Sequence, residues 1–90
     1  MKFVASQKVC NGNGVWKGYV KSTAACAELC KDKKHFIVGT NMNGKYQCGG
    51  GDDGSSCCKD NGSCKCWCQP DPCNQRQHAG YNLYEINPGN

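Results

Sequence analysis

Cysteine constrains this sequence more than any other residue, because ten of the 90 residues are Cys. The strong core formers Leu, Ile, Val and Phe together number only eleven, while Gly alone accounts for twelve. A chain this short buries a modest share of its surface, so such a core is marginal without reinforcement. This cysteine content is typical of disulfide scaffolds, which belong to oxidising compartments because cytosolic thiols are held reduced. We therefore predict one domain spanning residues 1–90, secreted or extracellular, with every cysteine in a disulfide: Cys10, Cys26, Cys30, Cys48, Cys57, Cys58, Cys64, Cys66, Cys68 and Cys73.

The first residues of the chain hint at a signal peptide but contain no apolar stretch of the required length. Met1 is therefore interpreted as an added start. No run of about eighteen apolar residues occurs in the sequence, which predicts that no segment spans a membrane.

Local patterns predict a strand, a helix and a hairpin in the first half of the chain. Val15–Val20 is rich in β-prone residues. Ser22 is a suitable N-cap for a helix over Thr23–Lys33, a run without Gly or Pro, with lysines at its negative end. Residues 35–42 and 45–48 flank Asn43-Gly44, the strongest short-range hairpin signal. A two-residue turn there would place Cys48 opposite Gly39.

The second half is richer in loop signals. We expect a flexible Gly-rich loop at 49–56, a second Asn-Gly turn at 61–62, and a strand over Cys64–Cys68 that ends at the prolines Pro70 and Pro72. Residues 81–86 are a good candidate for a closing strand.

The spacing of the cysteines predicts bridges between the helix and a strand. Residues four apart in a helix are separated by about 6 Å along the axis, and residues two apart in a strand by roughly 6.6 Å. Disulfides need Cα atoms roughly 4.4 to 6.8 Å apart, so two adjacent bridges across a helix–strand interface are feasible. We predict that Cys26 and Cys30 bridge to partners chosen from Cys48, Cys64, Cys66 and Cys68. Cys10 and Cys73 are candidates for closing the domain, and Cys57 and Cys58 should join different partners.

These motifs resemble the PAN/apple domains and the related N-terminal domains of hepatocyte growth factor and plasminogen. The resemblance covers about residues 10–86 and is carried by "VWKGYV", "STAACAELC", "HFIVGTNMNGKYQC", "CWC" and "GYNLYEI". It implies a small disulfide-rich α+β fold, a curved antiparallel sheet cradling one helix, with two bridges often tying that helix to the sheet. Family members are usually modules that bind proteins or carbohydrates in adhesion and attachment, and they are not enzymes. The chain differs from the family pattern in its ten cysteines, its Gly-rich insertion and its "CC" pair.

Catalytic and metal-binding patterns are weak. The seven acidic residues are scattered, His35 and His78 are the only histidines, and an even cysteine count leaves no obvious free thiol. No Cys-x-x-Cys occurs, although zinc sites usually use that gap, and the acidic loops lack the spacing of a calcium loop. We expect no enzyme, no metal and no cofactor.

Aromatic and basic side chains are the candidate ligand-binding residues. Trp67 should point to the face opposite Cys66 and Cys68, where it could stack on a sugar ring, anchor a protein partner or fill the core. Trp16 is expected to fill the core. The net charge of +4, with ten lysines to one arginine, favours loose attraction to acidic glycans over base readout. A basic patch that could meet an anionic glycan, or could simply be a solvated helix end, is formed by Lys31, Lys33, Lys34 and His35.

The sequence therefore predicts a secreted recognition module for an extracellular protein or glycan. Aromatic and basic residues do not interleave as in a nucleic-acid platform, so we expect no nucleic-acid partner. Two alternatives remain open: a freestanding toxin, effector or protease inhibitor acting through an exposed loop, and a structural component of a matrix or adhesive.

Overall fold

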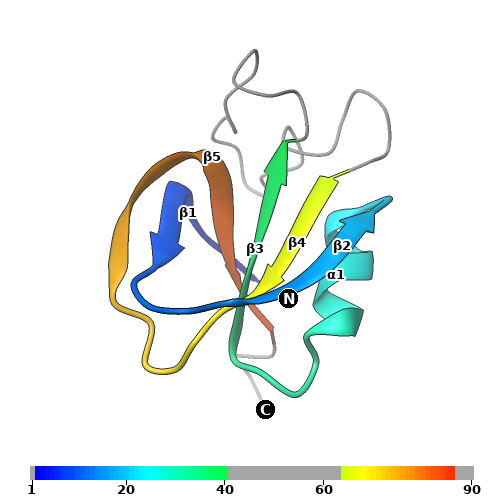
Figure 1. Ribbon diagram of the computed structural model, residues 1–90, viewed down its shortest axis with the longest axis horizontal. Coiled ribbons are helices and arrows are strands. Elements are labelled where there is room, and N and C mark those ends of the chain that lie inside the picture. Colours follow the sequence, from blue (N-terminus) through cyan, green and yellow to red (C-terminus); the bar gives the residue numbers. More distant parts are fainter. Residues whose placement is uncertain (1, 41–63, 87–90) are drawn as a thin grey trace.

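The computed structural model describes residues 2–40 and 64–86, which form one antiparallel sheet and one helix (Figure 1). The sheet has five strands in the order β1-β5-β3-β4-β2. The small disulfide-rich α+β class predicted from the sequence is therefore confirmed. The elements are β1 (Lys2–Cys10), β2 (Val15–Val20), α1 (Thr23–Leu29), β3 (His35–Thr40), β4 (Cys64–Cys68) and β5 (Gln75–Glu85).

The helix begins as predicted but ends early. The Ser22 Oγ accepts a hydrogen bond from the backbone N–H of Ala25 at 3.0 Å, which satisfies a donor that has no partner within the helix. The helix does not continue to Lys33, because Cys30 takes φ −109° and ψ 21° and is tied to β4 by its disulfide. The backbone N–H of Lys33 then donates to the Cys30 carbonyl at 2.8 Å, which turns the chain toward β3. At seven residues, α1 is too short to cross a membrane, and it is the one helix in the described ranges.

Strand β3 lies inside the sheet, which corrects part of the hairpin prediction. Gly39 is opposite Lys65 in β4 and also opposite Tyr81 in β5, so both of its edges are occupied. The predicted register of Gly39 with Cys48 is therefore wrong. The remainder of that hairpin, the Gly-rich loop and the Asn61-Gly62 turn lie outside the described residues.

Two long strands form the other side of the sheet. Strand β1, which the sequence analysis missed, pairs antiparallel with β5 along its whole length, from Lys2 opposite Glu85 to Cys10 opposite Gln75. Strand β5 contains the predicted closing strand but begins at Gln75, six residues before Tyr81. Figure 1 shows how strongly this pair bends away from β3 and β4.

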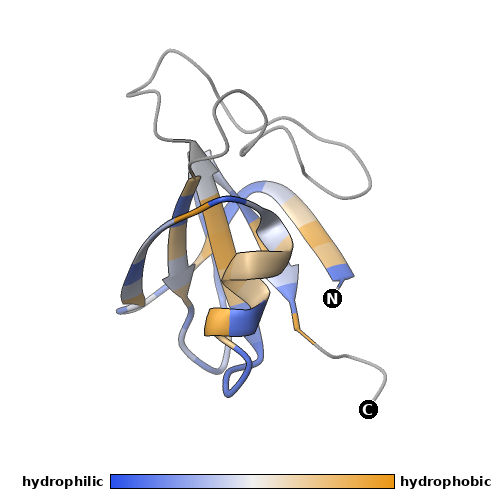
Figure 2. Cartoon of the chain, turned by 90° about the vertical axis from the view of Figure 1, so that its right-hand side faces the viewer, coloured by the Kyte–Doolittle hydropathy of each residue, from blue (hydrophilic) through white to orange (hydrophobic). Residues whose placement is uncertain are grey.

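Disulfides hold the helix against one face of the sheet. Cys26 bonds to Cys66 and Cys30 bonds to Cys68, with Cα–Cα distances of 5.6 and 5.4 Å, so the predicted helix-to-strand bridges are confirmed. Figure 2 shows α1 in front of the sheet, with apolar segments of the strands behind it. The buried core between them contains Val20, Cys26, Cys30, Phe36, Val38, Cys64, Cys66, Cys68, Tyr84 and Ile86.

A third bridge joins Cys10 at the end of β1 to Cys73 just before β5, as predicted for the outer cysteines. Cys64 is disulfide-bonded as well, with a partner that the described ranges do not contain. Several disulfides in so small a chain are consistent with an extracellular protein.

Candidate ligand-binding site

The sheet face opposite α1 has its own, smaller apolar cluster. Val9, Cys10, Ile37 and Leu83 are buried there, and Trp67 and Tyr81 pack partly buried against them. Because neighbouring residues of a strand point to opposite faces, Cys66 and Cys68 face the helix while Trp67 faces this second cluster. The prediction for the orientation of Trp67 is therefore confirmed.

Two rows of paired residues cross this face from strand to strand. In the first row Trp16 is opposite Trp67, which is opposite Ile37. In the second row Tyr19 is opposite Lys65, which is opposite Gly39, followed by Tyr81. The aromatic side chains thus come from β2, β4 and β5, three strands that are far apart in sequence.

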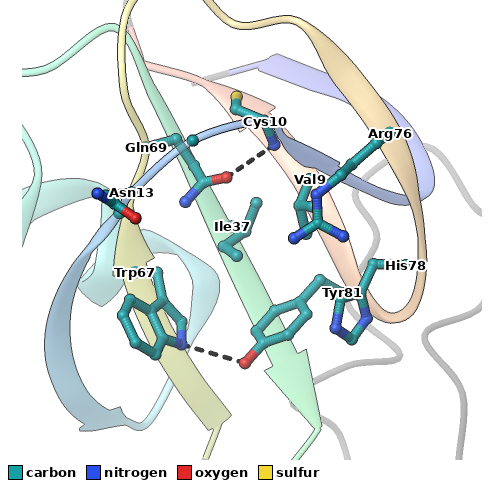
Figure 3. Close-up of a pocket in the computed structure, with 11 residues that line it drawn as sticks. Val9, Cys10, Asn13, Ile37, Trp67, Gln69, Arg76, His78 and Tyr81 are labelled. Carbon is teal, nitrogen blue, oxygen red and sulfur yellow. Dashed lines mark hydrogen bonds between the residues drawn. The ribbon is translucent and has the colours of Figure 1, made fainter.

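Gly39 shapes the centre of the face. A Cβ atom at this position would collide with the Tyr81 ring and would lie 2.9 Å from the Gly80 carbonyl oxygen. The missing side chain lets Tyr81 lie across β3, where its hydroxyl accepts a hydrogen bond from the Trp67 Nε1–H at 3.1 Å (Figure 3). This bond connects the two rows and restricts the orientation of the Trp67 and Tyr81 rings.

Trp16 extends the aromatic surface toward solvent, which corrects the prediction that it fills the core. Its side chain is 43% exposed, because β2 is an edge strand and α1 covers only the other face. The Trp16 ring lies 5.0 Å from the Trp67 ring and 5.4 Å from the Tyr19 ring, between centroids. Together these three side chains and Tyr81 form a surface that we call the aromatic face.

A pocket of about 410 Å³ lies beside Trp67 and Tyr81 (Figure 3). It is bounded by the end of β1 and the turn after it, by β3 and β4, and by the first half of β5. This volume falls within the range of about 300 to 1,000 Å³ that is usual for small-molecule sites. Its lining consists of Val9, Cys10, Gly12, Asn13, Gly14, Ile37, Trp67, Gln69, Arg76, His78 and Tyr81.

Gln69 is a buried polar residue at one end of the pocket. Its Oε1 accepts a hydrogen bond from the Cys10 backbone N–H at 2.7 Å, which fixes the orientation of the amide. Its Nε2 contacts the Cys68 carbonyl oxygen at a long 3.5 Å. Gly14 makes this arrangement possible, because a Cβ there would lie 2.6 Å from the Gln69 Nε2.

Arg76 and His78 line the opposite end of the pocket. The His78 Nδ1 accepts a hydrogen bond from the Gly80 backbone N–H at 3.2 Å, and the His78 ring meets the Tyr81 ring edge-on at 4.9 Å. Figure 3 shows the Arg76 side chain on the same wall, beside His78. Arg76 and His78 are both exposed, so solvent and ligands can reach them.

Partial burial raises the pKa of the Tyr81 phenol above its ordinary value of 10.0, and the nearby Tyr19 adds to this effect. The hydrogen bond from Trp67 opposes the shift, because it stabilises the phenolate, but it does not reverse it. Tyr81 therefore stays a neutral hydroxyl at physiological pH and can donate a hydrogen bond.

The predicted basic residues lie elsewhere, at the turn between α1 and β3. Lys31 pairs with Glu28 at 3.3 Å, Lys34 lies 3.7 Å from Asp71, and all these side chains are exposed. The His35 Nε2 lies 3.9 Å from a Glu85 carboxylate oxygen. Neither these residues nor Lys33 line the pocket, so the structure separates this patch from Trp67.

The cysteines that come closest to a metal-site geometry are explained by disulfides. The sulfurs of Cys26, Cys30 and Cys66 lie within 4.8 Å of one another, but all three residues are in bridges. A bridged sulfur is not a thiolate and is not the ligand that zinc requires.

Sequence reasoning missed Tyr81, Gln69, Arg76 and His78 as site residues. Tyr81 was visible only as part of a β-prone segment, and Gln69 as the residue before a proline. No family model, curated protein or solved structure matches the chain.

Proposed function

We propose that this chain is a secreted recognition module whose aromatic face binds a carbohydrate. The observation that carries the proposal is the surface formed by Trp16, Trp67 and Tyr81 on the sheet face that α1 leaves uncovered. Aromatic rings offer flat apolar surfaces, and Tyr and Trp combine such a surface with a polar group at one end. A sugar ring presents the matching combination, because its C–H groups make an apolar face and its hydroxyls surround the edge.

The pocket beside the aromatic face supports a small ligand over a broad protein interface. It is concave, its floor is apolar at Val9 and Ile37, and polar side chains stand at both ends. This combination of an apolar lining with a few oriented polar groups is typical of sites for small molecules. A protein that inserts one side chain into the pocket is the second candidate, because exposed Trp and Tyr residues also serve as anchors in protein interfaces.

Membership of the PAN/apple family is part of the proposal. The sequence motifs carry it, and the antiparallel sheet, the single helix and the two helix-to-sheet bridges agree with what that resemblance implies. Adhesion or attachment is the role that the resemblance suggests. A toxin, effector or protease inhibitor would act through residues 49–56 or 59–63, which lie outside the described part of the chain, and a matrix or adhesive component would act by self-association.

A glycan array with the oxidised protein tests the proposal. We expect saturable binding to one sugar class, weakened about tenfold by Trp16→Ala, since an aromatic contact of about 1.4 kcal/mol corresponds to that factor. Trp16 is well exposed, so its removal should leave the fold intact. Leu29→Ala is the matched control, because Leu29 is an exposed apolar side chain on α1. A blank array, or binding insensitive to Trp16→Ala, would contradict the proposal and direct the search to protein partners.

A further inference from the structure

The polar groups available in the pocket are mostly hydrogen-bond donors. This excess of donors bears on which class of sugar the proposed site would bind. A ligand that fills the pocket must supply acceptors to these donors, because burying a donor without a partner is unfavourable.

Gln69 presents mainly a donor. Its amide oxygen already accepts the Cys10 N–H at 2.7 Å and keeps one further lone pair, while its NH₂ group offers hydrogens. That group has two hydrogens, and within the described residues its hydrogen-bond contact is the long one to the Cys68 carbonyl oxygen at 3.5 Å. Gln69 is 5% exposed, so its remaining hydrogen is held in place at the end of the pocket.

Tyr81 also presents a donor. Its oxygen accepts from Trp67, and its own hydroxyl hydrogen has no acceptor among the described side chains and backbone groups. The Trp67 N–H is consumed by the same bond, so the pair offers a single O–H to the pocket.

His78 and Arg76 complete the set at the other end. Because the His78 Nδ1 accepts from Gly80, the neutral ring carries its hydrogen on Nε2, which is a donor. Arg76 adds a guanidinium with five N–H donors and a permanent positive charge. Figure 3 shows both side chains on the wall that the Tyr81 ring also forms.

Negative charge does not balance these groups. Among the described residues, no Asp or Glu lines the pocket. Asp71 lies 3.7 Å from the Lys34 Nζ, and Glu85 lies 3.9 Å from the His35 Nε2. Neither Lys34 nor His35 lines the pocket. Within the described part of the lining, Asn13 adds an amide that can accept as well as donate.

We propose that the pocket binds a pyranose sugar that carries a carboxylate, with the ring against Trp67 and Tyr81 and the carboxylate at Arg76. A carboxylate offers about four acceptor positions and no donor, which matches this set, and arginine binds it with two parallel bonds. A neutral sugar would bring hydroxyl hydrogens to a site that has few acceptors for them. The inference rests on the proposed carbohydrate-binding function and names its ligand class.

The test compares three methyl glycosides with the oxidised full chain by calorimetry and saturation-transfer NMR. The acidic probes are methyl N-acetylneuraminide and methyl glucuronide, and the neutral probe is methyl glucoside, which differs from the glucuronide only at the carboxylate. Measurements use about 0.15 M salt, where exposed charges are screened beyond about 8 Å. We expect at least one acidic probe to bind about tenfold or more tightly than the glucoside. The two acidic arms tell whether the sugar is a sialic or a uronic acid.

Arg76→Gln should remove about tenfold of the affinity for the acidic probe and leave glucoside binding unchanged. Arg76 is exposed, so this variant should fold, and near-ultraviolet circular dichroism verifies that it does. Lys21→Gln removes the same charge from an exposed position outside the pocket and is the matched control.

If the glucoside binds and neither acidic probe binds more tightly than it does, the carboxylate assignment is overturned while the carbohydrate function stays intact. Acidic binding that is lost on replacing Lys31, Lys33 and Lys34 by Gln, but retained in Arg76→Gln, would place the anion at the helix end and also overturn it. Failure of all three probes, together with a blank glycan array, would remove both the proposed function and this inference.

Discussion

Gly39 is a position where the absence of a side chain shapes the candidate site. We expect Gly39→Ala to destabilise the protein by about 1 to 3 kcal/mol, because the new methyl group would occupy the space of the Tyr81 ring. Displacement of that ring should also break the Trp67–Tyr81 hydrogen bond and change tryptophan fluorescence. Urea unfolding measures the first effect and the emission spectrum the second.

Gly80→Ala is the control for this substitution. A Cβ at Gly80 would meet only the His78 ring, at an ordinary 3.4 Å, and this variant should change stability by less than about 0.5 kcal/mol. If Gly39→Ala is as stable as Gly80→Ala and keeps the native emission spectrum, the placement of Tyr81 over Gly39 is wrong.

Tyr81 should titrate later than an ordinary tyrosine. Partial desolvation raises its pKa above 10.0 in the folded state, whereas the unfolded chain has the ordinary value. Because the folded pKa is the higher one, the stability linked to this group is fully present below pH 10 and is lost as the pH rises through the folded pKa. A phenolate absorbance titration of the native protein, minus that of Tyr81→Phe, should have its midpoint above pH 10. A difference signal with a midpoint at or below 10.0 would contradict the burial of this ring.

At the scale of elements, short-range signals predicted well and long-range pairing did not. The serine side chain at Ser22 is itself the cap, and the residues of Val15–Val20 are themselves β-prone. The start of α1 and the bounds of β2 were therefore predicted correctly from a few neighbouring residues. Strand β1 has no alternating pattern and depends on β5, which lies more than sixty residues away, so nothing local indicated it. The helix ends where the Cys30–Cys68 bridge ties the chain to β4. Helix propensities describe single residues and could not predict that contact.

The candidate site shows the same division. The direction of Trp67 follows from alternation within one strand, and it was predicted. The exposure of Trp16 depends on which face α1 covers, and the meeting of Trp67 with Tyr81 depends on β3 lying between β4 and β5. Both features are set by the order of the strands in the sheet and could not be derived from the sequence of one segment. The basic patch was visible in the sequence as a run of neighbours, but the sequence could not show that it lies away from the pocket.

Helix α1 should depend on its bridges for stability. Seven residues are too few for a helix that is stable alone in water, since isolated helices shorter than about 12 residues are marginal. We expect the double variant Cys30→Ala/Cys68→Ala to lose about 2 to 4 kcal/mol of unfolding free energy, because it opens a 38-residue separation between these positions.

Ser22→Ala is the reference variant with which the loss of unfolding free energy in the double variant is compared. It removes only the cap of the same helix and should cost about 1 kcal/mol. Urea unfolding of both variants under oxidising conditions makes the comparison. A double variant no less stable than Ser22→Ala would show that the apolar contacts of α1, and not its bridge to β4, hold the helix on the sheet.

For the whole molecule, disulfide-bonded cysteines make up much of the buried core. Half of the buried residues between α1 and the sheet are cysteines, and the second cluster contains Cys10 as well. Reduction would therefore do more than release cross-links. It would replace each bonded sulfur pair between α1 and the sheet by two separate thiol groups, which the buried core would have to accommodate. The remaining apolar side chains in these clusters are too few to compensate for a chain of this length.

We therefore expect reduction to unfold the protein at neutral pH without denaturant. Far-ultraviolet circular dichroism should lose its sheet signal after incubation with dithiothreitol, and binding at the aromatic face should disappear with it. Reoxidation in a glutathione buffer should restore both, which separates unfolding from chemical damage. A reduced chain that keeps its circular dichroism spectrum and its ligand would contradict this expectation. That result would remove the physical reason for confining this fold to oxidising compartments, because the fold would then be equally stable where thiols are kept reduced.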